Sequence, residues 1–418
     1  VSNSPGVISS ISLSASVRKA RHVLGVRGGG WSAVVNERAS VTLDDGSPTL
    51  LWHVAADDRW HDPAKEPGVR QQRRAGVPVV ETRVRIPGGD AVQRVYAVPD
   101  HGGLFVMEFS NESTLPIAIA LTRSDIISMR SPSPVGPQGI ELPEGSVVFP
   151  VAHGSTLRVA LSANGSQPAI NLDRLPNAEQ LQRGWLTSVE KAGWSIVPDK
   201  SLSPIINRLR SDALVLSAHP VSQWGDNIEA DDIAFLLTVH ELVRMGERVE
   251  QHIFAVVQAV ENVLKSQRKA ASVAWDAERA LFAAQCVFGA MGETRAASDV
   301  LLSRTRLADV GALPNEAPTD IRVIGWLDEQ LVSARRDGTV ALLRYGIPRM
   351  WLGVNFECHD IVVSHNQAVS YGVRWHAERP ALLWEVQGAS IALDAGATDP
   401  TWSSTATSGE TLLAGFLP

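Results

Sequence analysis

The period of the hydrophobic pattern changes twice along this chain, and no single motif constrains the fold as strongly. In the segment PVVETRVRI, residues 78–86, Val80, Val84 and Ile86 alternate with charged residues, which is typical of a half-buried β-strand. Similar runs end in Gly, Pro, Asn or Asp turns and occupy residues 92–98, 104–110, 115–122, 146–152 and 156–162. This spacing of about ten residues predicts a large antiparallel β-sandwich domain over residues 1–195.

The period lengthens after about residue 200. In EADDIAFLLTVHELVRMGE, Ile233, Leu236, Leu237, His240 and Val243 approximate the i, i+3, i+4, i+7 stripe of an amphipathic helix. Short breaks at MGERVE and MGETRA join neighbouring helical segments, and IGWLDEQLVSAR is compatible with one more helix. Residues 196–340 are therefore predicted to form a domain of antiparallel helical hairpins, equivalent to part of an α/α toroid.

Strand-like alternation returns in residues 341–418, where HAERP is a turn between VSYGVRW and ALLWEV. The predicted fold class is thus α+β and multi-domain. A large antiparallel β-sandwich comes first, a layer of antiparallel α-hairpins follows, and a small C-terminal β segment closes the chain.

Composition narrows the range of partners. The 418 residues include 44% hydrophobic and 20% charged residues, as in ordinary globular proteins. The formal net charge of −7 argues against a nucleic-acid partner and against an anionic membrane surface. No apolar run reaches 18 residues, and the first residues lack the layout of a secretion signal, so we expect a cytoplasmic protein. Cys286 and Cys358 are expected to be buried, reduced thiols.

Motifs for cofactors and metals are weak. RGGGW at residues 27–31 lacks the spacing of a phosphate-binding loop and is predicted to be a turn. The histidines lack the HxxxH or CxxC spacing of metal sites, although Glu357 and His359 alternate on a predicted strand. We therefore expect neither a cofactor nor a metal.

The order of sandwich, helical hairpins and β segment resembles the architecture of glucoamylase-like and phosphorylase-like carbohydrate enzymes, and SYGVRWHAERPALLWEV (370–386) looks like their closing β segment. The resemblance implies a saccharide ligand and a glycoside hydrolase or phosphorylase relative that uses paired carboxylates. The helical stretch has room for only five or six helices, whereas a complete toroid has about a dozen. The alternative is therefore a non-catalytic binding or assembly scaffold, and the helical layer could pair with a second copy in a homo-oligomer.

The candidate catalytic acids lie at two predicted helix starts. QWGDNIEADDIAF, residues 223–235, contains Asp226, Glu229 and Asp232, and WDAERALF, residues 275–282, contains Asp276 and Glu278. Glycoside hydrolysis needs two carboxyl groups, one protonated and one ionised. The alternative at the first helix start is a capping box, in which the side chains of Asp226 and Glu229 accept bonds from each other's backbone amides. The acids that follow would then interact favourably with the positive end of the helix dipole. The same alternative applies to the second start.

The candidate substrate-binding residues are aromatic or lie in a polar loop. Trp224 and Trp275 each neighbour a group of acids and could stack on sugar rings. The segment ADDRWHDPAKEPGVRQQRR, residues 56–74, is a long polar excursion that contributes Arg59, Trp60 and His61. The alternatives are core packing for the tryptophans and, for the loop, a solvated segment salt-bridged to its own domain.

Overall fold

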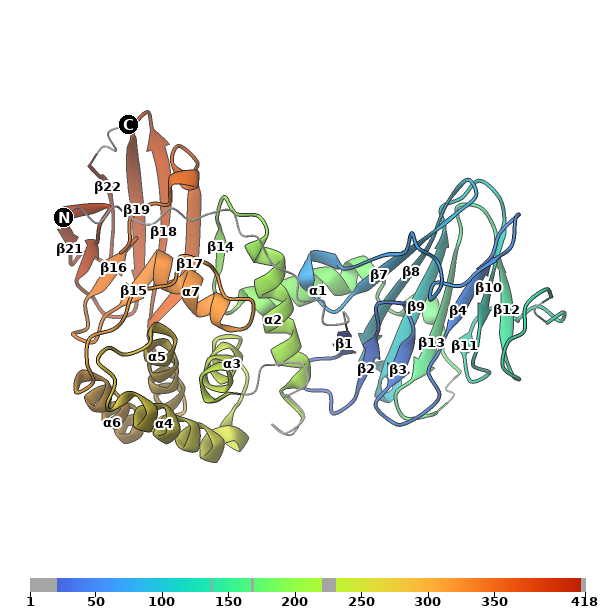
Figure 1. The fold of residues 1–418 in the computed structure, drawn as a ribbon, viewed down its shortest axis with the longest axis horizontal. Helices are drawn as coiled ribbons and strands as arrows, with labels where there is room; N and C mark the ends of the chain where they lie inside the picture. Colours follow the sequence, from blue (N-terminus) through green and yellow to red (C-terminus); the bar gives the residue numbers. More distant parts are fainter. Residues whose placement is uncertain (1–20, 137, 167–168, 220–230, 415–418) are drawn as a thin grey trace. The chain divides into compact units, whose positions relative to one another are not determined.

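The computed structural model describes residues 21–414, apart from 137, 167–168 and 220–230. These residues form seven α-helices and five β-sheets, which confirms the predicted α+β class (Figure 1). Contacts divide the chain into two compact units. The β unit comprises the described parts of residues 15–187 and 214–220, and the mixed unit those of residues 188–213 and 221–418. The three-domain division into residues 1–195, 196–340 and 341–418 stays a prediction.

The β unit contains three antiparallel sheets (Figure 1). One has the order β1 (His22–Gly25), β2 (Ser32–Val35), β3 (Val41–Leu43). The second has the order β12 (Val147–Val151), β10 (Ile117–Leu121), β4 (Trp52–Ala55), β5 (Trp60–His61). The third has the order β11 (Ile127–Ser128), β13 (Thr156–Ser162), β9 (Leu104–Asn111), β8 (Gly89–Val98), β7 (Val80–Ile86), β6 (Arg70–Arg73). Of these strands, β7, β8, β9, β10, β12 and β13 agree closely with the runs of period two named from the sequence.

One hydrophobic cluster joins residues from all three sheets of the β unit. Val35 in β2, Trp52 in β4 and Phe105 in β9 are fully or almost fully buried members of it. The alternation in β7 has the predicted consequence: Val84 and Ile86 are buried, whereas Arg85 between them is exposed. The sheets therefore share a core to which most of their strands contribute side chains.

Helix α1 (Ala178–Glu190) lies within the region predicted to contain only strands. Its first turn has a complete capping box, because Gln180 N donates to Asn177 Oδ1 and Asn177 N donates to Gln180 Oε1, both at 2.9 Å. Trp185 and Val189 are buried one turn apart. The sequence NAEQ carried this helix signal, and the prediction of strands through residue 195 was wrong here.

The mixed unit contains the other helices, which lie close to the predicted positions. They are α2 (Leu202–Leu216, whose last three residues belong to the β unit), α3 (Asp232–Arg244), α4 (Ile253–Gln267), α5 (Trp275–Ala290), α6 (Thr294–Thr305) and α7 (Arg322–Leu331). Within this unit, α3, α4, α5 and α6 gather at one end of the sheets, drawn in yellow-green to brown in Figure 1. Helix α5 contacts α3, α4, α6 and α7. It is therefore the central helix of the layer.

Two sheets complete the mixed unit. The larger has the antiparallel order β14 (Trp194–Ile196), β17 (Phe356–Ser364), β18 (Gln367–His376), β19 (Arg379–Gln387), β22 (Ser408–Leu412). The smaller has the order β15 (Val332–Ala334), β16 (Val340–Leu342), β20 (Leu393–Ala395), β21 (Asp399–Ser404). Its pairing of β16 with β20 is parallel. The predicted hairpin turn at residues 376–380 joins β18 to β19.

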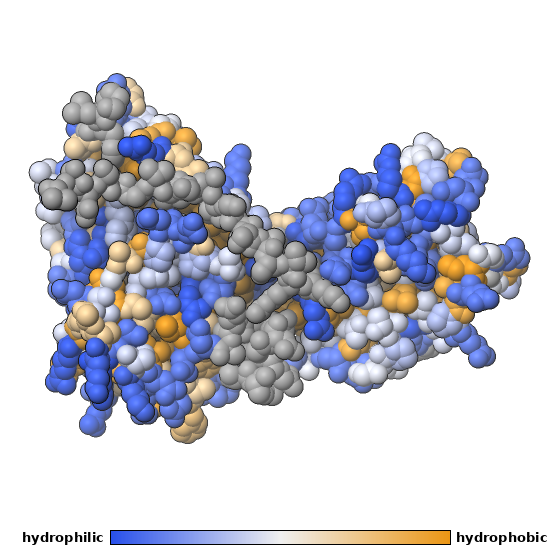
Figure 2. Space-filling model, in the orientation of Figure 1, coloured by the Kyte–Doolittle hydropathy of each residue, from blue (hydrophilic) through white to orange (hydrophobic). Residues whose placement is uncertain are grey.

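The surface is largely hydrophilic, and both cysteines lie in the interior. Hydrophilic residues cover much of the coloured surface in Figure 2, and apolar residues are scattered among them. Among the described helices, none has the length and apolar character needed to cross a bilayer. Cys286 and Cys358 are buried and unpaired, as predicted. Burial raises the pKa of the Cys286 thiol to about 12, which makes it a poor nucleophile at neutral pH.

Candidate functional site

The first turns of α5 form one wall of a cavity of about 350 Å³ in the mixed unit, which we call the acid–arginine cavity. Trp275, Glu278, Arg279 and Phe282 line it together because residues three, four and seven apart share a helix face. The remaining walls come from α6, α7 and the segments around β15 and β16, and they include Arg304, Asp309, Glu329, Arg335, Arg336, Asp337, Arg344 and Tyr345. A volume of this size suits a small organic ligand.

Glu278 is held in its ionised form by two guanidinium groups. Its Oε1 accepts bonds from Arg304 Nη2 at 2.7 Å and from Arg336 Nε at 3.0 Å, and its Oε2 accepts from Arg336 Nη2 at 2.6 Å. Burial acts to raise the pKa of Glu278, but the bonds and charges of Arg336 and Arg304 outweigh it and lower that pKa below its usual value. Glu278 is therefore a carboxylate at neutral pH.

Glu329, near the end of α7, lies in the opposite environment. Burial raises its pKa, and the charges of Arg279 and Arg344 only partly oppose this effect. Ser333 Oγ lies 2.5 Å from Glu329 Oε1, and Arg344 Nη1 lies 3.3 Å from the same oxygen. The protonated form of Glu329 is thus more favoured than in a free glutamate. Two carboxyl groups whose pKa values move apart in one cavity are suited to acid–base chemistry.

Three of the arginines that line this cavity make cation–π contacts with aromatic rings. The guanidinium carbons of Arg279 and Arg304 lie 4.8 Å and 5.4 Å from the centre of the Phe282 ring. Arg344 lies 5.4 Å from the centre of the Tyr345 ring. These cation–π contacts fix the direction of flat charged groups that line the wall.

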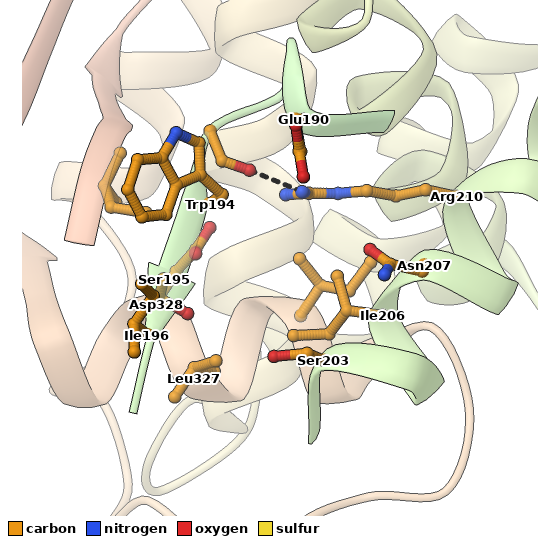
Figure 3. Close-up of a pocket in the computed structure, with 13 residues that line it drawn as sticks. Glu190, Trp194, Ser195, Ile196, Ser203, Ile206, Asn207, Arg210, Leu327 and Asp328 are labelled. Atoms are coloured by element: carbon orange, nitrogen blue, oxygen red, sulfur yellow. Dashed lines mark hydrogen bonds between the residues drawn. The ribbon is translucent and has the colours of Figure 1, made fainter. Parts of the chain in front are cut away.

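A second cavity of about 410 Å³, which we call the tryptophan cavity, also lies in the mixed unit. Figure 3 shows Trp194 from β14 on one side of it and Asn207 and Arg210 from α2 on the other. Trp194 stacks on His359 with ring centres 4.0 Å apart. Arg210 donates to the carbonyl oxygen of Gly193 at 2.5 Å, so its side chain ties α2 to the turn before β14.

A buried network of charged side chains connects the walls of the two cavities. Arg210 donates to Glu241 at 2.7 Å, and Arg244 donates to Glu241 at 2.6 Å and to Asp328 at 2.9 Å. Arg279 then donates to Asp328 at 2.7 Å. None of these five side chains is more than 6% exposed. The loss of one charge from such a network leaves its partners buried without compensation.

Of the candidate acids before and at the start of α3, only Asp232 is described, and it does not meet Glu278 in the cavity. Trp224, Asp226 and Glu229 lie outside the described residues, whereas Asp232 accepts a bond from Asn262 at 3.1 Å and does not line either cavity. The N-cap of α3 is Asp231, whose Oδ1 accepts from Ala234 N at 2.7 Å, so the helix begins after this residue.

Arg322 brings the starts of α3 and α5 together. It donates to Asp276 at 3.0 Å and also pairs with Asp231 and Asp320. Asp276 is thereby engaged in an ion cluster and does not line the acid–arginine cavity. Of the acids proposed from the sequence, Glu278 alone among the described ones lines either cavity, and Trp275 lines the same cavity.

The predicted binding residues of the 56–74 loop lie in the β unit and bond within it. Arg59 donates to both carboxylate oxygens of Glu66, at 2.6 Å and 3.2 Å. The buried His61 lies 2.9 Å from Asp58 and 3.2 Å from Glu66, and Trp60 Nε1 donates to Gln138 O at 2.7 Å. These contacts match the alternative of a loop salt-bridged to its own domain.

Sequence reasoning missed Glu329, Arg279 and Arg344. For Arg279 there was a signal, since it directly precedes the largely apolar segment from Ala280 to Val287 and a buried charge requires a partner. Among the described residues, no group of three or more His, Cys, Asp and Glu side chains is placed to hold a metal ion. Glu357 and His359 are only a pair, 3.7 Å apart.

Comparison with known proteins adds no family to this geometry: neither a scan against models of protein families nor a search of curated proteins found a match to the chain.

Proposed function

We propose that this chain is a carbohydrate-active protein and that the acid–arginine cavity binds its saccharide. One observation carries the proposal: Glu278 and Glu329 line the same cavity, and their environments move their pKa values in opposite directions. Glycoside cleavage requires this combination of a protonated and an ionised carboxyl group. Trp275 on the same helix face as Glu278 supplies a flat surface for a sugar ring.

In the proposed reaction, Glu329 donates its proton to the oxygen of the scissile glycosidic bond. Glu278 stays ionised and either attacks the anomeric carbon or activates a water molecule or phosphate on the opposite face of the ring. Arg304 and Arg336 keep Glu278 ionised and fix its orientation. The wider architecture is proposed to match: a β-sandwich in the β unit, followed by a partial toroid of helical hairpins and a closing β segment.

A non-catalytic saccharide-binding or assembly scaffold is the second candidate. The observation that favours it is the full engagement of Glu278, both of whose oxygens accept bonds from guanidinium groups. Such a carboxylate holds α5, α6 and the segment after β15 together even without catalysis. A homo-oligomer that pairs the partial helical layers belongs to this candidate.

Saccharide turnover and binding by matched variants separate the two candidates. Glu329→Gln keeps the shape of the side chain and removes the proton donor, while Glu261→Gln alters an exposed glutamate on α4 as a control. We expect wild-type protein and Glu261→Gln to cleave an oligosaccharide from a broad panel, with or without added phosphate. Glu329→Gln should lose at least about 100-fold in rate yet still be stabilised by the sugar in a thermal-shift assay. Binding without turnover in the wild type would favour the scaffold. The absence of any stabilising saccharide would contradict the enzyme and the saccharide-binding scaffold and leave the assembly scaffold.

A further inference from the structure

Arginines outnumber carboxyl groups in the lining of the acid–arginine cavity, and the arginines differ in how many of their donors have partners. Five arginines line it, against four carboxyl groups. Arg304 and Arg336 are committed to Glu278, and Arg335 is bound to both carboxylate oxygens of Asp394. All three of these guanidinium groups are engaged by protein carboxylates, although Arg304 and Arg336 share the one carboxylate of Glu278. Arg279 and Arg344 remain, and their donors decide what the cavity can bind.

Arg279 is a buried guanidinium with unused donors. Nη2 donates to Asp328, but that carboxylate oxygen also accepts from Arg244, so one negative charge serves two arginines. Within the described part of the chain, Nε and Nη1 of Arg279 have no hydrogen-bond partner, although the side chain is only 6% exposed. Because Nε and Nη1 are not among the fully enclosed polar atoms, they are accessible to an additional anion or polar group as partner.

Arg344 offers a more accessible set of donors on the same cavity. Nη1 contacts Glu329 at 3.3 Å and Ser333 at 3.2 Å, both long for charge-assisted bonds. Nε and Nη2 have no partner among the described residues, and the side chain is 38% exposed. The Tyr345 ring lies beside the guanidinium group. The planar fork of Arg344 is thus available to a carboxylate or phosphate, which binds such a fork through two parallel bonds.

We propose that the ligand of the acid–arginine cavity carries an anionic group, a carboxylate or a phosphate, which is bound by the free donors of Arg344 and Arg279. Together with the proposed function, on which it rests, this makes the substrate class an acidic saccharide, either a uronic acid or a sugar phosphate. A neutral sugar would leave the free donors of both arginines without an anionic partner.

Calorimetric titration with matched ligands tests the proposal. A panel of uronate-containing oligosaccharides is compared with the methyl esters of the same molecules, in which a neutral ester replaces each carboxylate. Glucose 6-phosphate is compared with glucose and with inorganic phosphate. We expect an acidic ligand to bind at least about tenfold more tightly than its neutral counterpart, and we expect the difference to shrink as the salt concentration rises.

Three arginine variants locate the anion. Arg344→Gln should remove most of the preference for the acidic ligand, and Arg279→Lys, which keeps the charge but loses the planar fork, should reduce it. Arg349→Gln removes an exposed arginine outside the cavity and should leave the preference unchanged. Because Arg279 belongs to the buried network, its variant is compared at a temperature where circular dichroism confirms that it is folded.

Each outcome gives a separate conclusion. Equal binding of acidic and neutral saccharides would overturn the anionic ligand but leave the carbohydrate function standing. Binding of inorganic phosphate as tight as that of glucose 6-phosphate would support the anion site and contradict the saccharide. An acidic preference that survives Arg344→Gln would place the anion elsewhere and overturn the assignment. The absence of binding by every ligand would contradict both proposals.

Discussion

Arg279 Nη2 donates a 2.7 Å hydrogen bond to Asp328 Oδ2, and this bond connects the wall of the acid–arginine cavity to the wall of the tryptophan cavity. The same oxygen accepts from Arg244 at 2.9 Å. Asp328 therefore compensates two buried positive charges, and the stability of α3, α5 and α7 depends on it.

Replacement of Asp328 by asparagine should strongly destabilise the protein. The amide leaves Arg244 and Arg279 with one fewer countercharge in a buried site, which costs about 3–5 kcal/mol of the free energy of unfolding. Urea denaturation followed by circular dichroism measures the loss. Asp299→Asn, at an exposed position on α6, is the control and should change that free energy by less than about 0.5 kcal/mol. Equal effects of the two variants would show that the network does not stabilise the fold.

Glu278 should contribute stability at neutral pH that is lost in acid. Its pKa in the folded state lies below the value of 4.5 of a free glutamate, so the contribution is complete above pH 4.5. It disappears as the pH falls from 4.5 through the folded-state pKa. The difference in free energy of unfolding between wild type and Glu278→Gln should therefore be constant above about pH 5.5 and shrink below pH 4.5. A difference that grows on acidification would contradict the assignment of Glu278 as an ionised group.

Glu329 should show the opposite sign. Its pKa is raised in the folded state, so the ionised form is less favourable there than in the unfolded chain. Stability is then lost as the pH rises from 4.5 toward the folded-state pKa, and Glu329→Gln should not show this loss. We expect the variant to be at least as stable as the wild type at pH 7, by thermal melting, and the two to converge below pH 4.5. A variant clearly less stable at pH 7 would indicate that Glu329 is an ionised partner of Arg344.

The start of α3 offers a test of the observed cap. Asp231→Ala removes both the bond to Ala234 N and the pairing with Arg322, and should cost about 1–2 kcal/mol. Asp231→Asn keeps a capping oxygen and should cost clearly less. Denaturation curves of the two variants measure the difference. If asparagine destabilised as much as alanine, the ion pair rather than the cap would dominate at this position.

The sequence predicted most of the elements because each has a local pattern. The alternation of Val80, Val84 and Ile86 marked β7, and Leu236, Leu237 and His240 are buried in α3 as their spacing indicated. Helix α3 is also buried outside the predicted apolar stripe, at Val239 and Glu241, and periodicity alone does not predict this. The missed helix α1 had its own signal in Asn177 and Gln180, where the capping box exists.

The site was only partly predictable. Trp275 and Glu278 were found because a tryptophan beside acids at a helix start is visible in a short segment. Glu329 was missed because the feature that distinguishes it, burial, is a property of the tertiary structure and leaves no signal in the local sequence. The opposite error occurred for Arg59 and His61, whose residue types suggested ligand binding while their bonds are made to Glu66 and Asp58. Residue type shows what a side chain can do, and tertiary contacts decide whether it is free to do it.

The most direct test of the proposed function compares wild type with Glu329→Gln on a single ligand, measuring both binding and cleavage. The ligand is the tightest-binding acidic oligosaccharide of the panel, with calorimetry for affinity and product release for turnover. We predict similar affinities, within about threefold, and turnover by the wild type that falls at least about 100-fold in the variant. Equal turnover by both proteins, or no measurable affinity of the wild type for any saccharide, would contradict it.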